Sequence, residues 1–320
     1  MNGNNPLVSV LIPSYNHEKY VQETINSIID QTYQNIELII LDDGSKDATL
    51  EKIQEMKKAC EKRFAKVHFE TKPNEGTCTT LNKLISLATG KYVYLIASDD
   101  LSKPQAIEKE VEFLENNPDY VMVVGDNELI DSTSQKVGWD KDQNIVPFSE
   151  AFYHSFGEYM KSKKDFDVLS DKFGAYETLV RGNYIPNGYM IRKSAFDKIG
   201  SFTKDAPLED WWLMLQLSKY GKLKYLDEIL FSYRQHDNNT VKRRDYMIQI
   251  SNQTLLYEEK LVNHFADKKW KALFEKNINQ IKMKFNFFNL IKLYKVNNLK
   301  EKKKVLEIAG HQFIFQKNSL

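Results

Sequence analysis

Short apolar runs rich in β-branched residues alternate with amphipathic segments over the first 125 of the 320 residues of this chain. Continuous apolar runs are typical of strands buried on both faces, whereas apolar residues three and four apart mark one face of a helix. The runs are LVSVLI (7–12), IELIILD (36–42), KYVYLIA (91–97) and YVMVVG (120–125), and the expected helices cover 20–31, 47–62, 77–88 and 104–116. This alternation predicts an α/β fold with an open, mainly parallel sheet.

Beyond residue 130 the alternation fades into polar, aromatic-rich sequence without a clear period. We expect loops and short elements over 130–185, a strand with a turn and a short helix over 187–202, and a helix over 209–221 that ends at Gly221. Residues 245–317 are predicted to be wholly helical. The chain therefore divides into a body over 1–241 and a helical extension over 242–320.

The net charge of +1 conceals an asymmetry between these two parts. From Lys242 onward there are 17 Lys and Arg against 7 Asp and Glu, a net charge of +10, which leaves −9 for residues 1–241. A basic segment of this kind attracts anionic surfaces, either nucleic acid or the anionic lipid of a membrane.

The location of the protein is predicted from two absences in its sequence. No run of about 18 apolar residues indicates a membrane span, and MNGNNPLVSV at the start lacks the features of a secretory signal. These observations predict a cytoplasmic protein.

Two adjacent carboxylates, Asp99 and Asp100, follow the strand at 91–97. Ligands of open α/β sheets bind beyond the carboxyl ends of the strands, and Mg²⁺ or Mn²⁺ prefers hard oxygen ligands. A divalent ion between these acids and a diphosphate would offset the repulsion between the charges. The alternative is a solvated turn in which Ser102 caps the following helix.

A second acidic doublet, Asp42 and Asp43, ends the strand at 36–42. Turn chemistry explains Gly44 and one of the two acids without a ligand. A carboxylate at this place would also accept a hydrogen bond from N3–H of a uracil ring, with Tyr15 against the face of the base. No glycine-rich dinucleotide motif or P-loop is present.

Two segments carry a resemblance to a known family. VSVLIPSYNHEKYVQETINSIIDQTYQNIELIILDDGSKDAT, followed by NEGTCTTLNKLISLATGKYVYLIASDD, resembles the family 2 glycosyltransferases, which are inverting enzymes of the GT-A fold that use nucleotide-sugar donors. The resemblance covers residues 6–125 closely and 180–240 more loosely. It implies that 1–125 form the nucleotide-sugar half and 126–241 the acceptor half of a catalytic domain.

The resemblance also implies roles for the residues at the strand ends. Asp100 would bind Mn²⁺ or Mg²⁺, and Asp99 would face the ribose or the diphosphate of a UDP-sugar or lie beside the metal. Many members of the family have Asp-x-Asp-Asp here, and this chain has Ala97 at the first position, which predicts weak metal dependence. The residues expected to hold the nucleoside are Pro13, Tyr15, Asn16, Asp42 and Asp43.

An acidic pair, Glu209 and Asp210, opens the helix predicted at 209–221. Acids at the start of a helix are favoured by the helix dipole, which is the purely structural explanation. The resemblance places the general base at this pair, and we assign it to Asp210, with Glu209 as the second candidate or an acceptor contact.

Residues near this pair are assigned to the acceptor side. Trp211 either packs in the core or stacks on an acceptor sugar, and the sequence does not decide between these roles. Trp212 is expected in the core. Asn183 and Asn187 lie in a segment that resembles the acceptor side of the family, although turn formation explains them equally well.

The segment FSYRQHDNNTV (231–241) resembles one that supplies a further metal ligand or a diphosphate contact in some relatives. His236 is the expected third ligand, and an imidazole there favours Mn²⁺ over Mg²⁺. Arg234 is expected to pair with the diphosphate or with a carboxylate at the sheet edge.

The extension mixes lysines with aromatic residues over 279–295. A helix of this composition either lies on an anionic membrane surface, such as the cytoplasmic face of an inner membrane, or packs on the body or on a second copy of the chain as a homodimer. Nucleic acid is not an expected partner, because the aromatic residues have helical rather than sheet spacing.

The sequence thus predicts a metal-dependent inverting glycosyltransferase that acts on bacterial lipooligosaccharide, capsule or a lipid-linked oligosaccharide. A catalytically silent scaffold that binds nucleotide-sugars or glycans is the alternative, and Ala97 mildly favours it. A nucleotidyltransferase is disfavoured by the absence of its glycine- and lysine-rich N-terminal motif.

Overall fold

A computed structural model describes residues 5–163, 166–278, 304–308 and 311–315 of the chain. These residues form two compact units, and each unit includes segments that are distant in the sequence. Unit 1 comprises the described residues of Met1–Phe173, Ile185–Phe202 and Tyr220–Asp237, and unit 2 comprises those of Gly174–Tyr184, Thr203–Lys219 and Asn238–Leu320.

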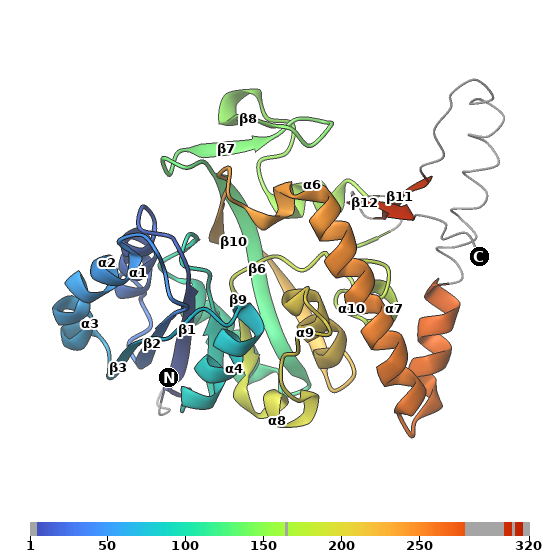
Figure 1. Cartoon of the computed structure of the whole chain (residues 1–320), viewed down its shortest axis with the longest axis horizontal. Coiled ribbons are helices and arrows are strands. Elements are labelled where there is room, and N and C mark those ends of the chain that lie inside the picture. The colour runs from blue at the N-terminus through green and yellow to red at the C-terminus, as the bar shows by residue number, and fades with distance from the viewer. Residues whose placement is uncertain (1–4, 164–165, 279–303, 309–310, 316–320) are drawn as a thin grey trace. The chain divides into compact units, whose positions relative to one another are not determined.

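One mixed sheet organises unit 1 (Figure 1). The strand order is β3-β2-β1-β4-β9-β6-β10-β5, and β7 and β8 continue from β6 as antiparallel strands. The strands are β1 (Val8–Ser14), β2 (Ile36–Asp42), β3 (Lys66–Thr71), β4 (Tyr92–Leu95), β5 (Leu101–Ser102), β6 (Tyr120–Ile130), β7 (Lys136–Trp139), β8 (Ile145–Pro147), β9 (Tyr189–Arg192) and β10 (Lys222–Arg234).

The sheet is mainly parallel in its first half. β3, β2, β1 and β4 pair in parallel, β9 is antiparallel to both β4 and β6, and β10 is parallel to β6. Consequently β1, β2, β4, β6 and β10 all point the same way, and their carboxyl ends meet at one edge of the sheet.

Helices cover both faces of this sheet, as the alternation of strands and helices predicts. They are α1 (Val21–Ile29), α2 (Thr49–Glu55), α3 (Lys57–Arg63), α4 (Thr77–Leu87), α5 (Ala106–Asn116), α6 (Phe156–Lys161) and α8 (Phe196–Ile199), with short 3-10 turns η1 (Phe148–Glu150) and η2 (Lys193–Ala195). α1, α2, α3 and α5 share one apolar cluster with alternate residues of β1, such as Val8, Val10 and Ile12. Successive strand residues face opposite sides, so α4, which contacts β1 and β2, covers the other face.

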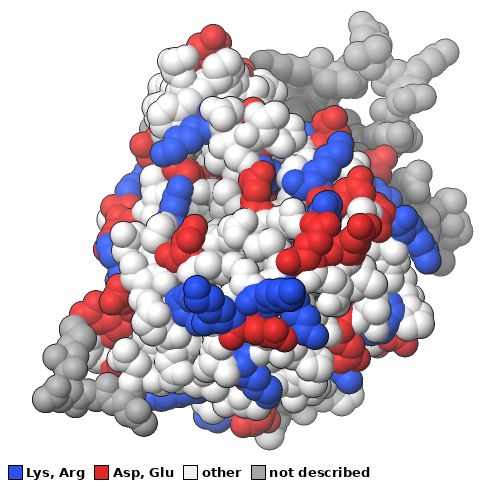
Figure 2. Space-filling view, turned by 90° about the vertical axis from the view of Figure 1, so that its left-hand side faces the viewer, with Lys and Arg blue, Asp and Glu red and all other residues white. Residues whose placement is uncertain are grey.

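The surface over α1, α2 and α3 mixes charges of both signs (Figure 2). In α2, Nζ of Lys52 lies 3.1 Å from Oε2 of Glu55, and in α3, Nζ of Lys57 lies 4.0 Å from Oε1 of Glu61. Exposed pairs of this kind add little to stability, and the face that Figure 2 shows presents no broad patch of one sign.

Unit 2 is mostly helical. Its elements are α7 (Tyr176–Leu179), α9 (Glu209–Leu217), η3 (Thr240–Lys242), α10 (Arg244–His264), a further helix over 268–278, and the strands β11 (Lys304–Ile308) and β12 (His311–Phe315). Lys219, Glu258 and Gln216 form a buried polar cluster, in which Lys219 Nζ lies 2.7 Å from Oε1 of Glu258.

The predicted fold class is confirmed, and two local predictions are wrong. Residues 245–317 are not wholly helical, because β11 and β12 pair as an antiparallel hairpin within that range. The helix expected at 209–221 ends at Leu217, with Ser218 rather than Gly221 as its C-cap. The predicted amphipathic helix at 279–295 lies outside the described residues.

Along the described part of the chain, no helix combines the length and the apolar character needed to cross a bilayer.

Candidate functional site

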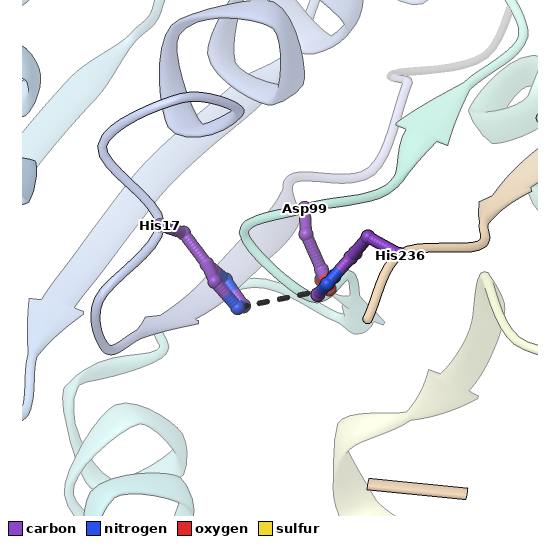
Figure 3. Close-up of side chains that lie close together, drawn as sticks. All are labelled: His17, Asp99 and His236. Atoms are coloured by element: carbon purple, nitrogen blue, oxygen red, sulfur yellow. Dashed lines mark hydrogen bonds and ion pairs between the residues drawn. The ribbon is translucent and has the colours of Figure 1, made fainter. Parts of the chain in front are cut away.

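Three loops at the carboxyl edge of the sheet bring one cluster of side chains together (Figure 3). His17 follows β1, Asp99 follows β4 and His236 follows β10. These strands are parallel to one another, so residues 137 apart in the sequence meet at one place.

The three side chains converge through single ligand atoms. Nε2 of His236 lies 2.9 Å from Oδ2 of Asp99, and Nε2 of His17 lies 3.7 Å from the same oxygen. One ligand atom of each residue lies within 4.8 Å of the others. Asp99 and His236 are buried, and the side chain of His17 is 24% exposed.

Neighbouring groups fix both imidazole rings. Nδ1 of His17 lies 2.7 Å from Oγ of Ser98, and the backbone N–H of His17 donates to Oγ1 of Thr49 at 2.7 Å. The ring of Tyr20 stacks on that of His236, with centroids 5.0 Å apart. These contacts hold the rings of His17 and His236 in place.

The electrostatics of the cluster favour a charged Asp99 and a neutral His17. Burial acts to raise the pKa of Asp99, but its hydrogen bond with His236 and the charges of His17 and His236 outweigh burial and lower the pKa. Burial lowers the pKa of His17, against the opposing charge of Asp99. An ionised carboxylate and a neutral imidazole are the forms of these side chains that bind metal ions.

The structure places Asp100 beside the backbone of Arg234. Asp100 is 1% exposed, and its Oδ1 accepts a 2.8 Å hydrogen bond from the backbone N–H of Arg234. Burial, followed by the charge of Asp99, raises the pKa of Asp100 well above its usual value. Asp100 is thus not part of the three-residue cluster, and its predicted role as a metal ligand stays a prediction.

The guanidinium of Arg234 is fully buried. It donates to the Asp99 carbonyl at 2.6 Å and to Oε2 of Glu23 at 2.8 Å, and it lies over the ring of Tyr20. Of the two predicted roles, these contacts favour pairing with a carboxylate over contact with a diphosphate.

Asp43, which follows β2, is held by the segment that follows β3. Asp43 accepts hydrogen bonds from Nζ of Lys72 and from the backbone N–H groups of Glu75 (3.0 Å) and Gly76 (2.9 Å). Burial acts to raise the pKa of Asp43, but these bonds outweigh it and lower the pKa. Asp43 is therefore a buried carboxylate held in its charged form.

The other predicted nucleoside residues lie at the ends of β1 and β2. Tyr15 is 43% exposed and Pro13, near the end of β1, is half-buried. Asn16, in the left-handed region at φ 55°, accepts from the backbone N–H of Lys46 at 2.8 Å and so ties the two loops together. Asp42 accepts a hydrogen bond from Oγ1 of Thr71 at 2.7 Å and so stabilises its own loop.

The acidic pair of unit 2 opens α9, as the sequence predicts. Oδ2 of Asp210 accepts a 2.9 Å hydrogen bond from Nδ2 of Asn183, and its Oδ1 accepts from the backbone N–H of Trp211 at 2.6 Å. Desolvation raises the pKa of Asp210. Desolvation, followed by the charge of Asp210, raises the pKa of Glu209 to about 7.

The two tryptophans after this pair belong to the core of unit 2. Trp211 is 1% exposed, and its Nε1 donates to the carbonyl of Leu179 at 2.8 Å. This burial argues against the predicted stacking of Trp211 on an acceptor sugar. Trp212 is 3% exposed, in agreement with its predicted place in the core. Asn187 is half-buried and belongs to unit 1.

A family model described as "Glycosyl transferase family 2" matches residues 9–200, which are more than half of the chain. The chain belongs to glycosyl transferase family 2.

Relatives and solved structures agree with this assignment. An uncharacterized glycosyltransferase of Haemophilus influenzae is 28% identical over 95% of this chain and 84% of its own length. Chondroitin synthase of Pasteurella multocida is 28% identical over 75% of this chain, which corresponds to 22% of that protein. This family 2 glycosyltransferase therefore has relatives in polysaccharide synthesis.

Two solved structures share the fold. The mannosyltransferase PcManGT from Pyrobaculum calidifontis, solved with GDP-Man and Mn²⁺, has a TM-score of 0.59 and 15% identity over 85% of this chain and 69% of its own. TarS 1-349 from S. aureus, solved with UDP-GlcNAc, has a TM-score of 0.57 and 16% identity over 85% of this chain and 71% of its own. At these identities the likeness concerns the fold alone.

His17 is the residue of this family 2 glycosyltransferase that sequence reasoning missed. It lies within the quoted YNHEKY motif, but one histidine in a polar loop does not indicate which strand end it will face. The donor set of two imidazoles and one carboxylate suits a first-row transition ion, because imidazole nitrogen ligates Mn²⁺ more readily than Mg²⁺. The residues present therefore fit a divalent metal ion.

Proposed function

We propose that this family 2 glycosyltransferase transfers a sugar, with inversion at the anomeric carbon, from a UDP-sugar to a hydroxyl group of a glycan. The observation that carries the proposal is the placement of two buried carboxylates after β2 and β4, the strands that flank β1. Asp43 is the first and Asp99 the second. A uracil ring and a metal-bound diphosphate are the ligand groups that these two carboxylates suit.

The contacts of Asp43 support a uridine donor. Because its carboxylate is held charged by three N–H donors, Asp43 is suited to accept a hydrogen bond from N3–H of uracil. The exposed ring of Tyr15 is available to pack against the base. Asn16 joins the two loops that would enclose the nucleoside, with Pro13 and Asp42 shaping them. Both structural neighbours were solved with nucleotide-sugars.

The cluster at Asp99 supports a metal-dependent donor site. Asp99 and His236 would hold Mn²⁺, or Mg²⁺ more weakly, with Asp100 as a further ligand. Asp100 also accepts a hydrogen bond from the backbone N–H of Arg234, which would keep the end of β10 in place. Lewis-acid stabilisation of the departing diphosphate is the chemistry that the ion supplies when bound.

The acidic pair of unit 2 supports base catalysis. An acceptor hydroxyl loses its proton as it attacks, and a carboxylate with a raised pKa accepts that proton well near neutral pH. We assign this role to Asp210, which Asn183 and the helix start hold in one orientation, and keep Glu209 as the second candidate. Asn187 is assigned to the acceptor side.

The acceptor is proposed to be a growing bacterial polysaccharide or a lipid-linked glycan, in line with the relatives in polysaccharide synthesis. We assign catalysis to residues 1–241 and association with an anionic membrane, on its cytoplasmic face, to the basic extension from 242. A homodimer through that extension is the competing arrangement, and binding to anionic vesicles that is lost on truncation at 242 decides between them.

The experiment that tests the function measures donor binding and donor cleavage separately. We expect UDP-sugars, but not GDP-Man, to bind the wild type in calorimetry with Mn²⁺ present, and we expect slow release of UDP. Asp210→Asn should lower transfer by about 10²–10⁴ and leave the donor Kd nearly unchanged. Asp142→Asn, which removes an exposed carboxylate in the β7–β8 turn, is the matched control.

Two outcomes contradict the proposal. Absence of UDP-sugar binding removes the donor assignment, and full activity of Asp210→Asn removes the base assignment. Donor binding without any hydrolysis or transfer identifies the protein as a catalytically silent scaffold instead.

A further inference from the structure

We propose that His17 is a third protein ligand of the metal site, which makes it a two-histidine, one-aspartate site selective for Mn²⁺ and similar transition ions over Mg²⁺. The inference rests on the proposed function, because it concerns the same ion beside Asp99 and His236. It adds a ligand from the loop after β1, a segment of the chain to which we had assigned only nucleoside binding.

The orientation of the His17 ring is the first observation behind this proposal. A histidine that ligates a metal through one nitrogen normally engages its other nitrogen in a hydrogen bond, which fixes the tautomer and the ring. Nδ1 of His17 lies 2.7 Å from Oγ of Ser98, adjacent to Asp99 in the sequence. This contact directs Nε2 of His17 towards the Asp99 carboxylate, as Figure 3 shows.

The second observation is that Nε2 of His17 is left without a hydrogen bond among the described residues. Its nearest carboxylate oxygen, Oδ2 of Asp99, is 3.7 Å away, which is beyond the range of a good hydrogen bond. Nε2 of His236 already lies 2.9 Å from that oxygen. Nε2 of His17, beside a charged carboxylate but beyond good hydrogen-bond distance from it, is therefore available as a ligand atom.

The third observation is the spacing of the ligand atoms. Ligands about 2.0–2.2 Å from one ion lie roughly 3–4.4 Å from one another. The separations of 2.9 Å and 3.7 Å from Oδ2 of Asp99 are close to this range. Small movements of the two rings would therefore let all three residues contact one ion.

The selectivity follows from ligand chemistry. Mg²⁺ prefers oxygen ligands and keeps several of its waters, so a second imidazole adds little to its binding. Imidazole nitrogen binds Mn²⁺, and the later transition ions more strongly still. Each histidine in the site therefore raises the preference for a transition ion.

The test is a titration of the full chain with Mn²⁺ alone, in which free Mn²⁺ is followed by electron paramagnetic resonance, and a competition with Mg²⁺. We expect His17→Ala to weaken Mn²⁺ binding about 10–100-fold and Mg²⁺ binding much less. His68→Ala is the matched control, because His68 also lies 2.9 Å from a carboxylate, that of Glu70, but far from the cluster in the strand order. His17→Gln serves as a second variant should His17→Ala fold poorly.

A spectroscopic readout separates ligation from mere positioning. Pulsed electron paramagnetic resonance spectra of bound Mn²⁺ should contain nitrogen couplings from two imidazoles in the wild type and from one in the His17 variants. Unchanged couplings, unchanged Mn²⁺ affinity, or equal losses for Mn²⁺ and Mg²⁺ would each overturn the proposal.

The same titration, repeated with UDP, distinguishes this failure from failure of the proposed function. If the wild type binds Mn²⁺ and the His17 variants match it, only the His17 assignment fails. If the wild type binds no Mn²⁺ with or without UDP, the metal-dependent donor site fails together with it.

Discussion

Nδ2 of Asn183 donates a 2.9 Å hydrogen bond to Oδ2 of Asp210 at the start of α9. The bond stabilises the charged form of a carboxylate whose pKa desolvation has raised. It joins an irregular segment, which the sequence left without predicted structure, to the acid that we propose as general base.

Asn183→Ala should therefore shift the pH dependence of transfer. Loss of the donor removes support for the carboxylate, so the pKa of Asp210 rises further and the acid limb of kcat/KM moves to higher pH. Asn116→Ala, which removes an exposed amide that donates to the Glu112 carbonyl, is the control. An unchanged acid limb would show that Asp210 is not the base or that Asn183 does not tune it.

Glu209→Gln should change how stability depends on pH. The pKa of Glu209 is about 7 in the folded state against 4.5 for the free side chain, so the folded state binds more protons between these values. Stability therefore falls as pH rises from about 4.5 to 7, on the order of 3 kcal/mol for this group. Glu209→Gln should remove this loss and be more stable than the wild type at pH 8.

Urea unfolding at pH 5 and pH 8 measures this effect. Glu51→Gln, an exposed acid in the first turn of α2, should leave the difference between the two pH values as in the wild type. Glu209 and Asp210 are neighbours, so the measured transition belongs to the pair. A Glu209→Gln variant with the same loss of stability as the wild type would refute the raised pKa.

Asp43→Asn should weaken and broaden nucleotide binding. A hydrogen bond to a charged acceptor contributes roughly 1.5–3 kcal/mol, so the UDP Kd should rise about 10–100-fold. Preference for UDP over GDP should fall with it, because Asp43 is the group proposed to recognise uracil. Calorimetry measures both constants. Equal UDP affinity in Asp43→Asn and the Asp142→Asn control would show that Asp43 does not bind the uracil ring.

The periodic pattern of the first 125 residues was enough to predict the mainly parallel sheet and its helices, because buried strands and amphipathic helices are recorded in local spacing. β3 was not singled out, since it is only half-buried and has polar residues at several positions. The C-terminal hairpin was missed because the whole of 245–317, which has many lysines and no proline, was predicted to be helical.

The placement of acids at strand ends could also be read from the sequence, since motifs and strand ends coincide there. The sequence did not show which of the adjacent acids faces the cluster. Asp99 and Asp100 are adjacent, and only the packing of β10 beside them turns Asp100 to a backbone N–H of Arg234 and leaves Asp99 to His236. Likewise, only the parallel alignment of β1 with β4 brings His17 to Asp99, 82 positions further along the chain. Local spacing records periodicity and turns, whereas contacts between distant loops depend on strand order and burial, which exist only in the folded chain.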